Sequence, residues 1–569
     1  MGKRKLPLTV DDVETEPDEQ SGTKSKKEAD SDEFISFLSS SLSSDKIETI
    51  TSRSQRGARF NLEGMPTGMH AGGVTPMTFS HEAASDQQWV EKLVTNFNEA
   101  LDGYAEQEAT SLRSLASLMA KYVDISLTTT SKSNHRTAYC AHALNHVIRT
   151  RNLVIANKRR LEAATEKGTV NEALIESMRD QGFVRPTVLI LSAYRKNAFK
   201  IVEAIKQLMF GNDNPRAEVV NKARFEKEFK ETKFSLPKRL KAEDEEDGNQ
   251  DDCFRLGIAL SRKSLKLYSP FDISDILLCS PLGLRMILGG DKGSESHLLS
   301  SIQLLVIDDA DVLLQQNWEH VSLIADTLHG TPSKINSDVS RVRTLYLEGH
   351  ASLYCQTLLF CSHRHELFTA FMSKRQNHRG AVTFKPPSDG FLTEIEIPIC
   401  SEMHRIHVEE AADQSDIRMA YFREKVVPTL EDQTAIFIPS YFDFVRIRNQ
   451  FKKDMESFVQ CQEYAPPNKI TRARDMFYRG DKKLMLITER FHYYNRFRLR
   501  GIKRLVFYQP PSCPSFYPEV INMCQPTGRL LCTLLFTKFD RIRMENVFGF
   551  DMGNTIMKSE KQILAILSE

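Results

Sequence analysis

The clearest pattern along the chain is an alternation of short, continuous apolar runs with longer segments whose apolar residues recur every three or four positions. The runs are typical of buried β-strands, and the spaced segments are typical of amphipathic helices. Strands that alternate with helices favour parallel sheets that are covered on both faces. The runs lie at Thr187–Leu191, Asp275–Cys279, Leu304–Ile307, Gln356–Cys361, Ala435–Ile438, Leu484–Thr488, Arg504–Tyr508 and Leu531–Phe536.

These patterns divide the chain into four parts. Residues 1–80 are acidic, rich in serine and short of aromatic residues, so we expect a disordered tail. Residues 81–180 show helical spacing, and we expect a helical lead-in that packs on the first lobe. Two α/β lobes follow, at residues 181–395 and 396–569, and a charged insert interrupts the first at about residues 212–250.

Charge is balanced over the whole chain but not along it. The 569 residues contain 76 Lys and Arg against 75 Asp and Glu, a formal charge of +1, which excludes a uniformly cationic coat protein. Between Tyr441 and Tyr508, however, 16 Lys and Arg face only seven Asp and Glu, with 14 Phe and Tyr interleaved. Cations neutralise phosphates and aromatic rings stack on bases, so this stretch is a candidate surface for RNA or an acidic partner. The candidate residues are Arg472, Arg474, Arg496, Arg498, Arg500, Lys503 and Arg504.

Membrane, secretory and disulfide classes are disfavoured. No apolar run approaches the length that a bilayer requires, and the N-terminus lacks the apolar core of a signal peptide. The ten cysteines form no CxxC pair. We therefore expect a soluble protein in a reducing compartment, without a membrane partner.

The most informative motif is the segment Leu305–Leu313, with the sequence LVIDDADVL. An apolar strand ends there in Asp308, Asp309 and Asp311, and carboxylates beyond the end of a parallel strand suit a Mg²⁺ bound to nucleotide phosphates. The segment looks like the Walker B motif of DEAD-type helicases. The alternative is that these aspartates simply begin and cap the next helix.

Neighbouring segments support the helicase comparison in order and spacing. Ser192–Lys196, Ile276–Leu288 and Leu358–His363 fall where such helicases have their other first-lobe motifs. The catalytic parts are missing, however. No GxxxxGK[ST] loop occurs to cradle phosphates, and Val520–Arg529 lacks the arginine-rich pattern of the second lobe. We expect no enzyme activity, no cofactor and no catalytic residue.

A possible metal site arises from His142 and His146, which stand four residues apart on one predicted helix. That spacing suits zinc, but no glutamate follows the first histidine as in HExxH and no third ligand is evident. The alternative is a packed or solvent-facing pair of histidines, and we assign no metal site.

Longer strings of the sequence resemble the digestive organ expansion factor family, which are pseudo-DEAD-box proteins of the U3 small nucleolar ribonucleoprotein. The resemblance covers about residues 85–569. It rests on Tyr139–Val147, Arg185–Ile190, Leu267–Arg285, Asp308–Val321, Ile438–Lys452 and Leu486–Tyr494.

The resemblance implies two RecA-like lobes without helicase activity and a location in the nucleolus of the nucleus. It also implies a role in processing the small-subunit ribosomal RNA precursor within the small-subunit processome. The implied partners are processome proteins together with U3 small nucleolar RNA or the ribosomal RNA precursor, and no small-molecule substrate. Under this resemblance Asp308, Asp309 and Asp311 are a vestigial Walker B segment.

Two other functions stay open at this point. One is an unconventional RNA-dependent ATPase or helicase that uses Asp308 and Asp311 with a phosphate site supplied from elsewhere. Such an ATPase would have to replace several kcal/mol of positioning and electrostatic stabilisation, on the order of what a phosphate cradle supplies. The other is a pure protein adaptor that never contacts RNA.

Overall fold

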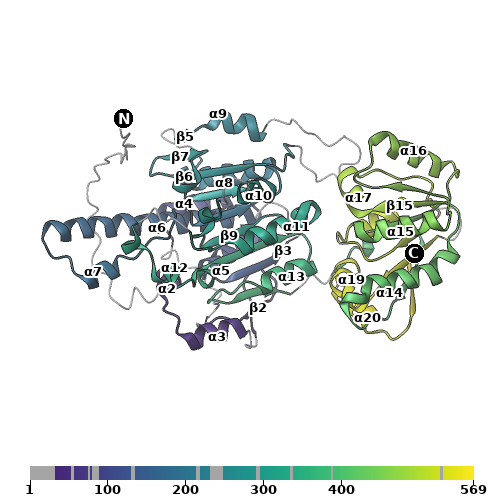
Figure 1. Cartoon of the computed structure of the whole chain (residues 1–569), viewed down its shortest axis with the longest axis horizontal. Coiled ribbons are helices and arrows are strands. Elements are labelled where there is room, and N and C mark those ends of the chain that lie inside the picture. Colours follow the sequence, from purple (N-terminus) through teal and green to yellow (C-terminus); the bar gives the residue numbers. More distant parts are fainter. Residues whose placement is uncertain are drawn as a thin grey trace.

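Two α/β lobes make up the computed structural model of the chain (Figure 1). The structure describes residues 32–52, 57–74, 77, 79, 89–129, 135–212, 218–230, 248–289, 295–332, 338–385, 389–525 and 530–568. The expected α/β fold class with two tandem lobes is confirmed. Among the described residues, no helix combines the length and the apolar character needed to cross a bilayer.

The first lobe is built on an eleven-stranded sheet whose centre is parallel. The central strands run in the order β11, β3, β10, β9, β4, β8, and most of their residues are buried because helices cover both faces. These strands are β3 (Asp124–Thr128), β4 (Val188–Leu191), β8 (Ile276–Cys279), β9 (Leu304–Ile307), β10 (Gln356–Cys361) and β11 (Ala381–Phe384).

Both edges of this sheet depart from the parallel pattern. On one side β6 pairs antiparallel with β8, and β7 pairs antiparallel with β6. On the other side β2 pairs antiparallel with β11 and carries β1. The edge strands are β1 (Ala58–Phe60), β2 (Gly68–Ala71), β5 (Glu218–Val220), β6 (Arg255–Leu260) and β7 (Ser264–Leu267).

Alternation along each strand sends side chains into two separate cores. Val188 and Ile190 of β4 pack with one set of helices, and Leu189 and Leu191 pack with the other. The first set is α4 (Glu91–Leu101), α5 (Glu106–Ala120), α6 (His135–Glu166) and α8 (Arg195–Phe210). The second set is α10 (Pro281–Leu288), α11 (Ala310–Thr327) and α13 (Glu366–Ser373). Shorter helices are α7 (Glu172–Ser177), α9 (Lys222–Phe225) and α12 (Thr344–Leu347).

The second lobe repeats this plan with seven strands in the order β14, β15, β13, β16, β17, β12, β18, all parallel except β18. Helices α14 (Gln414–Tyr421) and α15 (Tyr441–Lys453) cover one face. The other face carries α16 (Pro467–Tyr478), α17 (Glu489–Asn495), α18 (Phe516–Ile521), α19 (Arg541–Phe548) and α20 (Phe550–Lys558). The strands are β12 (Ile399–Arg405), β13 (Thr434–Ile438), β14 (Phe458–Cys461), β15 (Leu484–Thr488), β16 (Arg504–Phe507), β17 (Leu531–Phe536) and β18 (Ile563–Ser568).

The expectation of a disordered tail over residues 1–80 is wrong for residues 32–52 and 57–74. These residues form α2 (Glu33–Ser39), α3 (Ser44–Ser52) and the strands β1 and β2. The physical reason is that Phe34 and Phe37 are buried against the first lobe, which offsets the entropy that composition alone assigns to this segment. Residues 1–31 lie outside the described residues.

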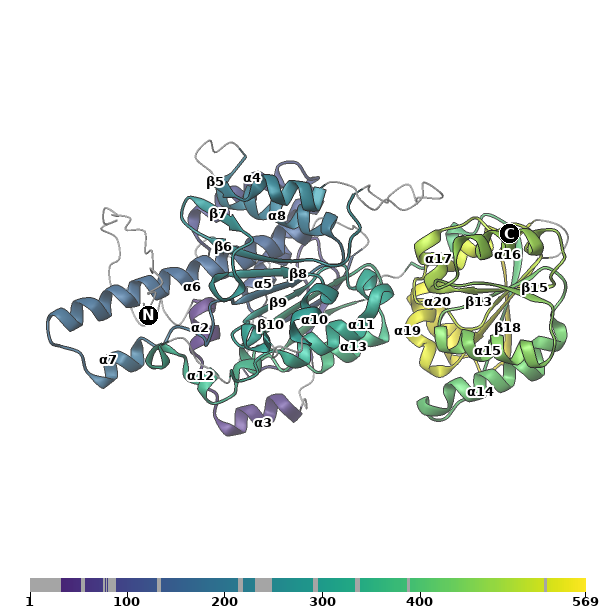
Figure 2. The same cartoon turned by 45° about the horizontal axis from the view of Figure 1, so that its top comes forward.

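The segment at 81–180 is also more than a helical lead-in. It contributes β3, which lies between β10 and β11 in the middle of the first sheet, so the first lobe begins well before residue 181. Helix α6 then runs outward from the lobe, and α7 lies beside its far end, on the side away from the second lobe (Figures 1 and 2). Of the charged insert at about 212–250, residues 213–217 and 231–247 lie outside the described residues.

Candidate functional site

Asp308 and Asp309 lie directly beyond the carboxyl end of β9, where the sequence places the Walker B-like segment. The Asp308 amide donates to the carbonyl of Leu191 at 2.9 Å, which ties this end of β9 to the end of β4. Asp309 occupies the N-cap position of α11 with a left-handed φ of 51°, but its side chain makes no capping hydrogen bond. Helix capping therefore does not explain this carboxylate.

Arg136 holds both carboxylates from the first turn of α6. Its Nε donates to Asp308 Oδ2 at 3.0 Å, and one terminal nitrogen donates to Asp309 Oδ2 at 2.5 Å. His135 Nε2 lies 3.1 Å from the other oxygen of Asp308, and the Asn197 amide donates to Asp309 at 2.7 Å. Burial by itself would raise the pKa of Asp308, but Arg136 and His135 outweigh it and lower that pKa below its ordinary value.

The position of Arg136 is what makes this arrangement informative. In P-loop proteins the phosphate-binding loop joins a buried strand to the helix that follows it. Here the connection from β3 leads into α6, and this helix brings Arg136 against the carboxylates of Asp308 and Asp309. A guanidinium of the chain itself thus lies where Mg²⁺ would meet the acidic residues. Residues 130–134 of the connection lie outside the described residues.

Asp311 is engaged by the end of a different strand. The main-chain amide and the hydroxyl of Ser362 both donate to its carboxylate, at 2.9 Å each. Ser362 follows β10, in the segment that sequence comparison aligned with a first-lobe helicase motif. The structure thus brings two of the helicase-like segments together, and each carboxylate oxygen of Asp311 accepts a hydrogen bond from Ser362.

Among the described residues, His135, Asp308 and Asp309 form a cluster with the composition of a metal site, with ligand atoms within 4.8 Å of one another. Their facing atoms, however, already bond one another, Arg136 and Asn197. A cation would have to displace a buried guanidinium, so we assign no metal here. Sequence reasoning missed His135 and Arg136, because nothing local in the sequence shows that α6 begins beside β9.

The histidine pair on α6 lies in the core. His142 Nε2 lies 2.7 Å from the side-chain oxygen of Gln356, and His146 Nε2 lies 2.9 Å from that of Gln303. Burial lowers the pKa of His142 to about 4 and that of His146 to about 3. Two buried histidines whose Nε2 atoms bond amides are structural side chains, which favours the packing alternative over zinc.

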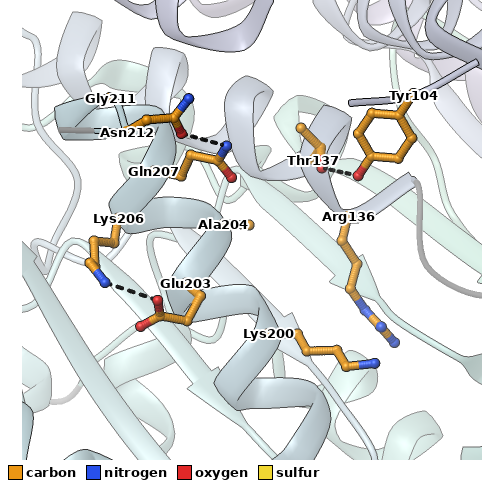
Figure 3. Close-up of a pocket in the computed structure, with 10 residues that line it drawn as sticks. All are labelled: Tyr104, Arg136, Thr137, Lys200, Glu203, Ala204, Lys206, Gln207, Gly211 and Asn212. Carbon is orange, nitrogen blue, oxygen red and sulfur yellow. Dashed lines mark hydrogen bonds and ion pairs between the residues drawn. The ribbon is translucent and has the colours of Figure 1, made fainter. Parts of the chain in front are cut away.

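A pocket of about 430 Å³ adjoins the degenerate site between α6 and α8 (Figure 3). Arg136 forms part of its wall, and Lys200 extends from α8 beside it. Burial and the neighbouring Arg136 lower the pKa of Lys200. Glu203 and Lys206 form an ion pair of 2.9 Å on the same wall, so the charges that line the pocket are partly balanced within the protein.

The basic candidates of the second lobe fall into two groups, of which the first is exposed. These side chains belong to α16 and to the segment between α17 and β16, and they leave their charges in solvent. The exposed candidates are Arg472, Arg498, Arg500 and Lys503.

The second group serves the fold. Arg496 pairs with Glu519 at 2.5 Å, and Arg474 lies 4.4 Å from the ring centroid of Phe497. Arg504 lies on β16, is only 9% exposed and donates to the main-chain carbonyl of Thr429. The structure therefore does not bring the seven predicted residues into one surface.

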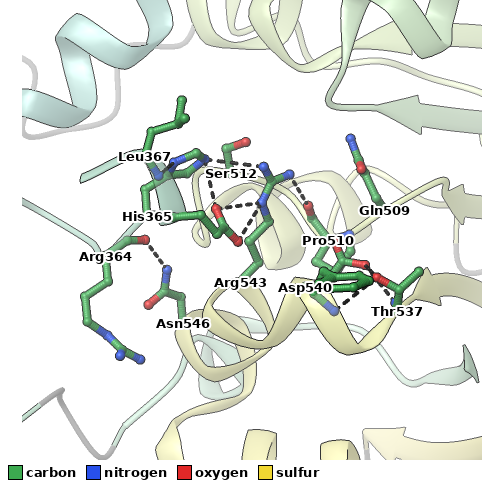
Figure 4. A network of polar contacts seen from close by, with 12 residues as sticks. Arg364, His365, Leu367, Gln509, Pro510, Ser512, Thr537, Asp540, Arg543 and Asn546 are labelled. Atoms are coloured by element: carbon green, nitrogen blue, oxygen red, sulfur yellow. Dashed lines mark hydrogen bonds and ion pairs between the residues drawn. The ribbon is translucent and has the colours of Figure 1, made fainter. Parts of the chain in front are cut away.

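A network of polar contacts joins the two lobes, and Arg543 of α19 is its centre (Figure 4). Its guanidinium reaches Glu366 at 3.4 Å, His365 Nε2 at 3.3 Å and the carbonyl of Pro510 at 3.4 Å. Burial, followed by the charge of Arg543, lowers the pKa of His365 to about 2, so this imidazole is neutral, and its Nδ1 accepts from the Leu367 amide. An arginine of the second lobe is thus bound by the first.

Further contacts extend this interface. Arg364 pairs with Glu545 at 2.6 Å, while Asn546 donates to the carbonyl of Arg364 at 2.7 Å. Elsewhere the Tyr494 hydroxyl donates to the carbonyl of Gln315 at 3.3 Å. These bonds connect the two lobes directly.

Comparison with known proteins gives matches over both lobes. Residues 122–382 match the family described as UTP25, NTP hydrolase-like domain, and residues 391–566 match Utp25, C-terminal domain. The U3 small nucleolar RNA-associated protein 25 of Schizosaccharomyces pombe is 35% identical over 494 residues, which is 82% of this chain and 74% of that protein. The Protein NUCLEOLAR FACTOR 1 of Arabidopsis thaliana is 34% identical over 460 residues, 75% of this chain and 60% of that one.

The mouse U3 small nucleolar RNA-associated protein 25 homolog is 37% identical over 446 residues, and the match covers 75% of this chain but only 57% of the mouse protein. The chain thus spans less than two thirds of the length of that relative. Among solved structures, the yeast DEAD-box splicing factor Prp28 matches with 11% identity and a TM-score of 0.30, covering 92% of this chain and 96% of Prp28. The assignment of the lobes rests on strand order rather than on that match.

Proposed function

The chain belongs to the Utp25 family, and from this membership we propose that it is a non-catalytic, helicase-like scaffold of the small-subunit processome. In this role it supports processing of the small-subunit ribosomal RNA precursor in the nucleolus. Its relatives carry the name U3 small nucleolar RNA-associated protein, which supports a place in ribosome biogenesis. Its partners are processome proteins together with U3 small nucleolar RNA or the ribosomal RNA precursor.

The observation that carries the non-catalytic part is the Arg136 guanidinium between Asp308 and Asp309. Phosphoryl transfer of this type needs Mg²⁺ near those carboxylates and a loop that cradles phosphates. Here a side chain neutralises the carboxylates, and the sequence holds no GxxxxGK[ST] loop. A nucleotide would have to displace a buried ion pair and bind without its usual cradle.

Titration with a fluorescent ATP analogue in the presence of Mg²⁺ tests this point. We expect no saturable signal up to about 1 mM nucleotide, the upper end of typical Michaelis constants. An active DEAD-box helicase in the same buffer provides the positive control. Saturable, Mg²⁺-dependent binding that unlabelled ATP displaces would overturn the proposal and favour the unconventional ATPase.

The docking part of the proposal rests on the exposed cations of the second lobe and on the preformed contacts between the lobes. Because the lobes already bond each other, a partner meets one fixed surface and does not have to order it first. Crosslinking the full chain to RNA in cells, followed by sequencing of the RNA and identification of co-purifying proteins, tests this part. Processome proteins without crosslinked RNA would favour a pure protein adaptor.

A further inference from the structure

The segment Asp32–Ser40 lies on the first lobe in the manner of a bound peptide. It includes α2, and it precedes both of the segments that match the Utp25 family, which begin at residue 122. Phe34 and Phe37 point into the lobe and are 3% and 0% exposed, whereas Ile35 between them is 38% exposed. One face of a single helical turn therefore carries the contact.

Phe37 enters a slot between two rings. Tyr122 stacks on one side of it with a centroid distance of 4.5 Å and an interplanar angle of 13°. His378 stacks on the other side at 5.1 Å and 15°, and its Nε2 also lies 3.0 Å from the carbonyl of Phe37. The slot thus binds both the ring and the backbone of this residue.

The acidic start of the helix meets a matching set of cations. Glu33 accepts from Lys121 and from Arg379, each at 2.9 Å. Asp32 accepts from Arg149, whose guanidinium also lies over the ring of Phe34 at 4.6 Å. Three basic side chains therefore surround the acidic pair, and one of them also contacts an aromatic ring.

The backbone beyond Phe37 is held as well. Arg343 donates to the carbonyl of Leu38 at 3.4 Å, and the Tyr354 hydroxyl donates to the carbonyl of Ser40. Arg379 donates to the hydroxyl of Ser36 at 2.8 Å. The groove therefore binds the acidic side chains, the two aromatic side chains and the main-chain carbonyls of Asp32–Ser40. Proteins recognise short helical peptides through contacts of this kind.

This contact is separate from the main cores. Phe34, Phe37 and Leu38 belong to a hydrophobic cluster with Tyr122 and Tyr354 that is distinct from those of the two sheet faces. Helix α2 has only seven residues, too few for a stable helix by itself, and a serine-rich link follows it. It folds because it is bound, and no strand pairing in the described residues depends on it.

We propose that this groove is an exchangeable peptide-docking site and that α2 is its resident ligand. The partner it fits is a protein segment of the same pattern, with two acidic residues followed by phenylalanines three positions apart. Such a segment binds when α2 leaves the groove, so the chain regulates access to its own surface. The inference does not depend on RNA or nucleotide binding.

A labelled synthetic peptide with the sequence of residues 30–42 tests the proposal on the full chain. We expect it to bind the variant F34A/F37A and to bind the unaltered chain at least about tenfold more weakly, because the resident helix competes. A peptide with Phe37→Ala should lose at least about tenfold in affinity for the variant, while one with Ile35→Ala should not. Equal binding to both chains, or none to a variant with an unchanged circular dichroism spectrum, would overturn the proposal.

A second chain keeps the test decisive if F34A/F37A does not fold. A protease site placed between Ser40 and Ser44 is cut after folding, so that the resident segment is no longer tethered. We expect labelled peptide to replace the cut segment within the assay, measured by fluorescence anisotropy and mass spectrometry. Retention of the cut segment against excess peptide would contradict exchange.

Discussion

Arg136 Nε lies 3.0 Å from Oδ2 of Asp308, and that carboxylate has no exposed surface. The two residues are 172 positions apart in the chain, on different elements of the first lobe. Their ion pair neutralises the buried carboxylate and connects the start of α6 to the end of β9.

Removal of this guanidinium should destabilise the first lobe strongly. We expect Arg136→Ala to lower the free energy of unfolding by about 3–5 kcal/mol, because it leaves a buried carboxylate without its partner. The measurement is urea denaturation followed by circular dichroism. Adding Asp308→Asn should restore part of the loss, since a neutral amide is easier to bury than a charge.

Arg479→Ala is the control for that experiment, because this arginine is 65% exposed in its side chain and pairs with Asp475 one turn away. Exposed pairs of this kind contribute less than about 1 kcal/mol. Equal stability of Arg136→Ala and Arg479→Ala would show that the buried pair does not support the lobe.

Acid should destabilise the protein through buried histidines. Burial lowers the pKa of His142 to about 4 and those of His146 and His378 to about 3. Unfolded histidine titrates near about 6.5, so below that pH the unfolded chain takes up protons that the folded chain does not, and stability falls. Burial raises the pKa of Asp124 to about 7, which opposes this effect between about pH 7 and 4.

Burial also lowers the pKa of His329 to about 4 and that of His365 to about 2, so the shifted histidines outnumber Asp124 and we expect a net loss of stability with each pH unit below about 6. Urea denaturation at pH 7.5, 6.5 and 5.5 measures it. His142→Gln should flatten the dependence by about 1.4 kcal/mol per pH unit, whereas His407→Gln should not, because His407 is 88% exposed in its side chain. A flat profile in the unaltered protein would contradict the burial of these imidazoles.

Removal of the Arg543 side chain should increase the motion of the two lobes relative to each other. We expect Arg543→Ala to broaden the distribution of distances between a fluorophore on each lobe, because it removes the contacts with Glu366 and His365. Single-molecule energy transfer measures this distribution. Arg446→Ala is the matched control, since its ion pair with Asp416 lies within the second lobe. Identical distributions in the two variants would mean that other contacts fix the lobes.

Charge reversal of the exposed cations of the second lobe should show whether these side chains bind RNA or a protein partner. We expect glutamate at Arg472, Arg498, Arg500 and Lys503 to weaken binding of single-stranded RNA and to reduce the salt dependence, by about 0.7 in slope for each lost phosphate contact. Binding is measured by filter retention at several salt concentrations.

The control reverses four exposed cations of the first lobe, namely Lys158, Arg262, Lys263 and Lys266. An equal loss in both proteins would mean that only net charge matters. No loss in either would assign the cations of the second lobe to a protein partner.

Much of the fold can be predicted from the sequence, because strands buried on both faces appear as continuous apolar runs. The runs at Leu304–Ile307 and Leu531–Phe536 match β9 and β17 residue for residue. Strand β3 was missed, since Asp124–Thr128 mixes polar and apolar residues in the middle of the sheet. The boundary between lead-in and first lobe was misplaced for the same reason.

Only part of the candidate site could be predicted from the sequence. Asp308 and Asp309 follow from a strand that ends in carboxylates, but their partner Arg136 does not, since an ion pair between distant segments leaves no local pattern. The bound segment near the N-terminus was missed because the average composition of residues 1–80 hides a short apolar segment within it. Burial of Phe34 and Phe37 also depends on the rings of Tyr122 and His378, which lie far away in the sequence.

The guanidinium of Arg136 differs from a nucleotide-bound metal in one further respect, since it cannot be released. A helicase that binds and hydrolyses ATP changes conformation with each turnover. The free energy of ATP hydrolysis drives the release of its partners. Under the proposed function, a lobe whose counter-charge is covalently attached has no such cycle, and its state does not follow the ratio of ATP to ADP in the cell. Its departure from an assembly would then be driven by another molecule, such as a competing ligand or an energy-consuming remodelling enzyme.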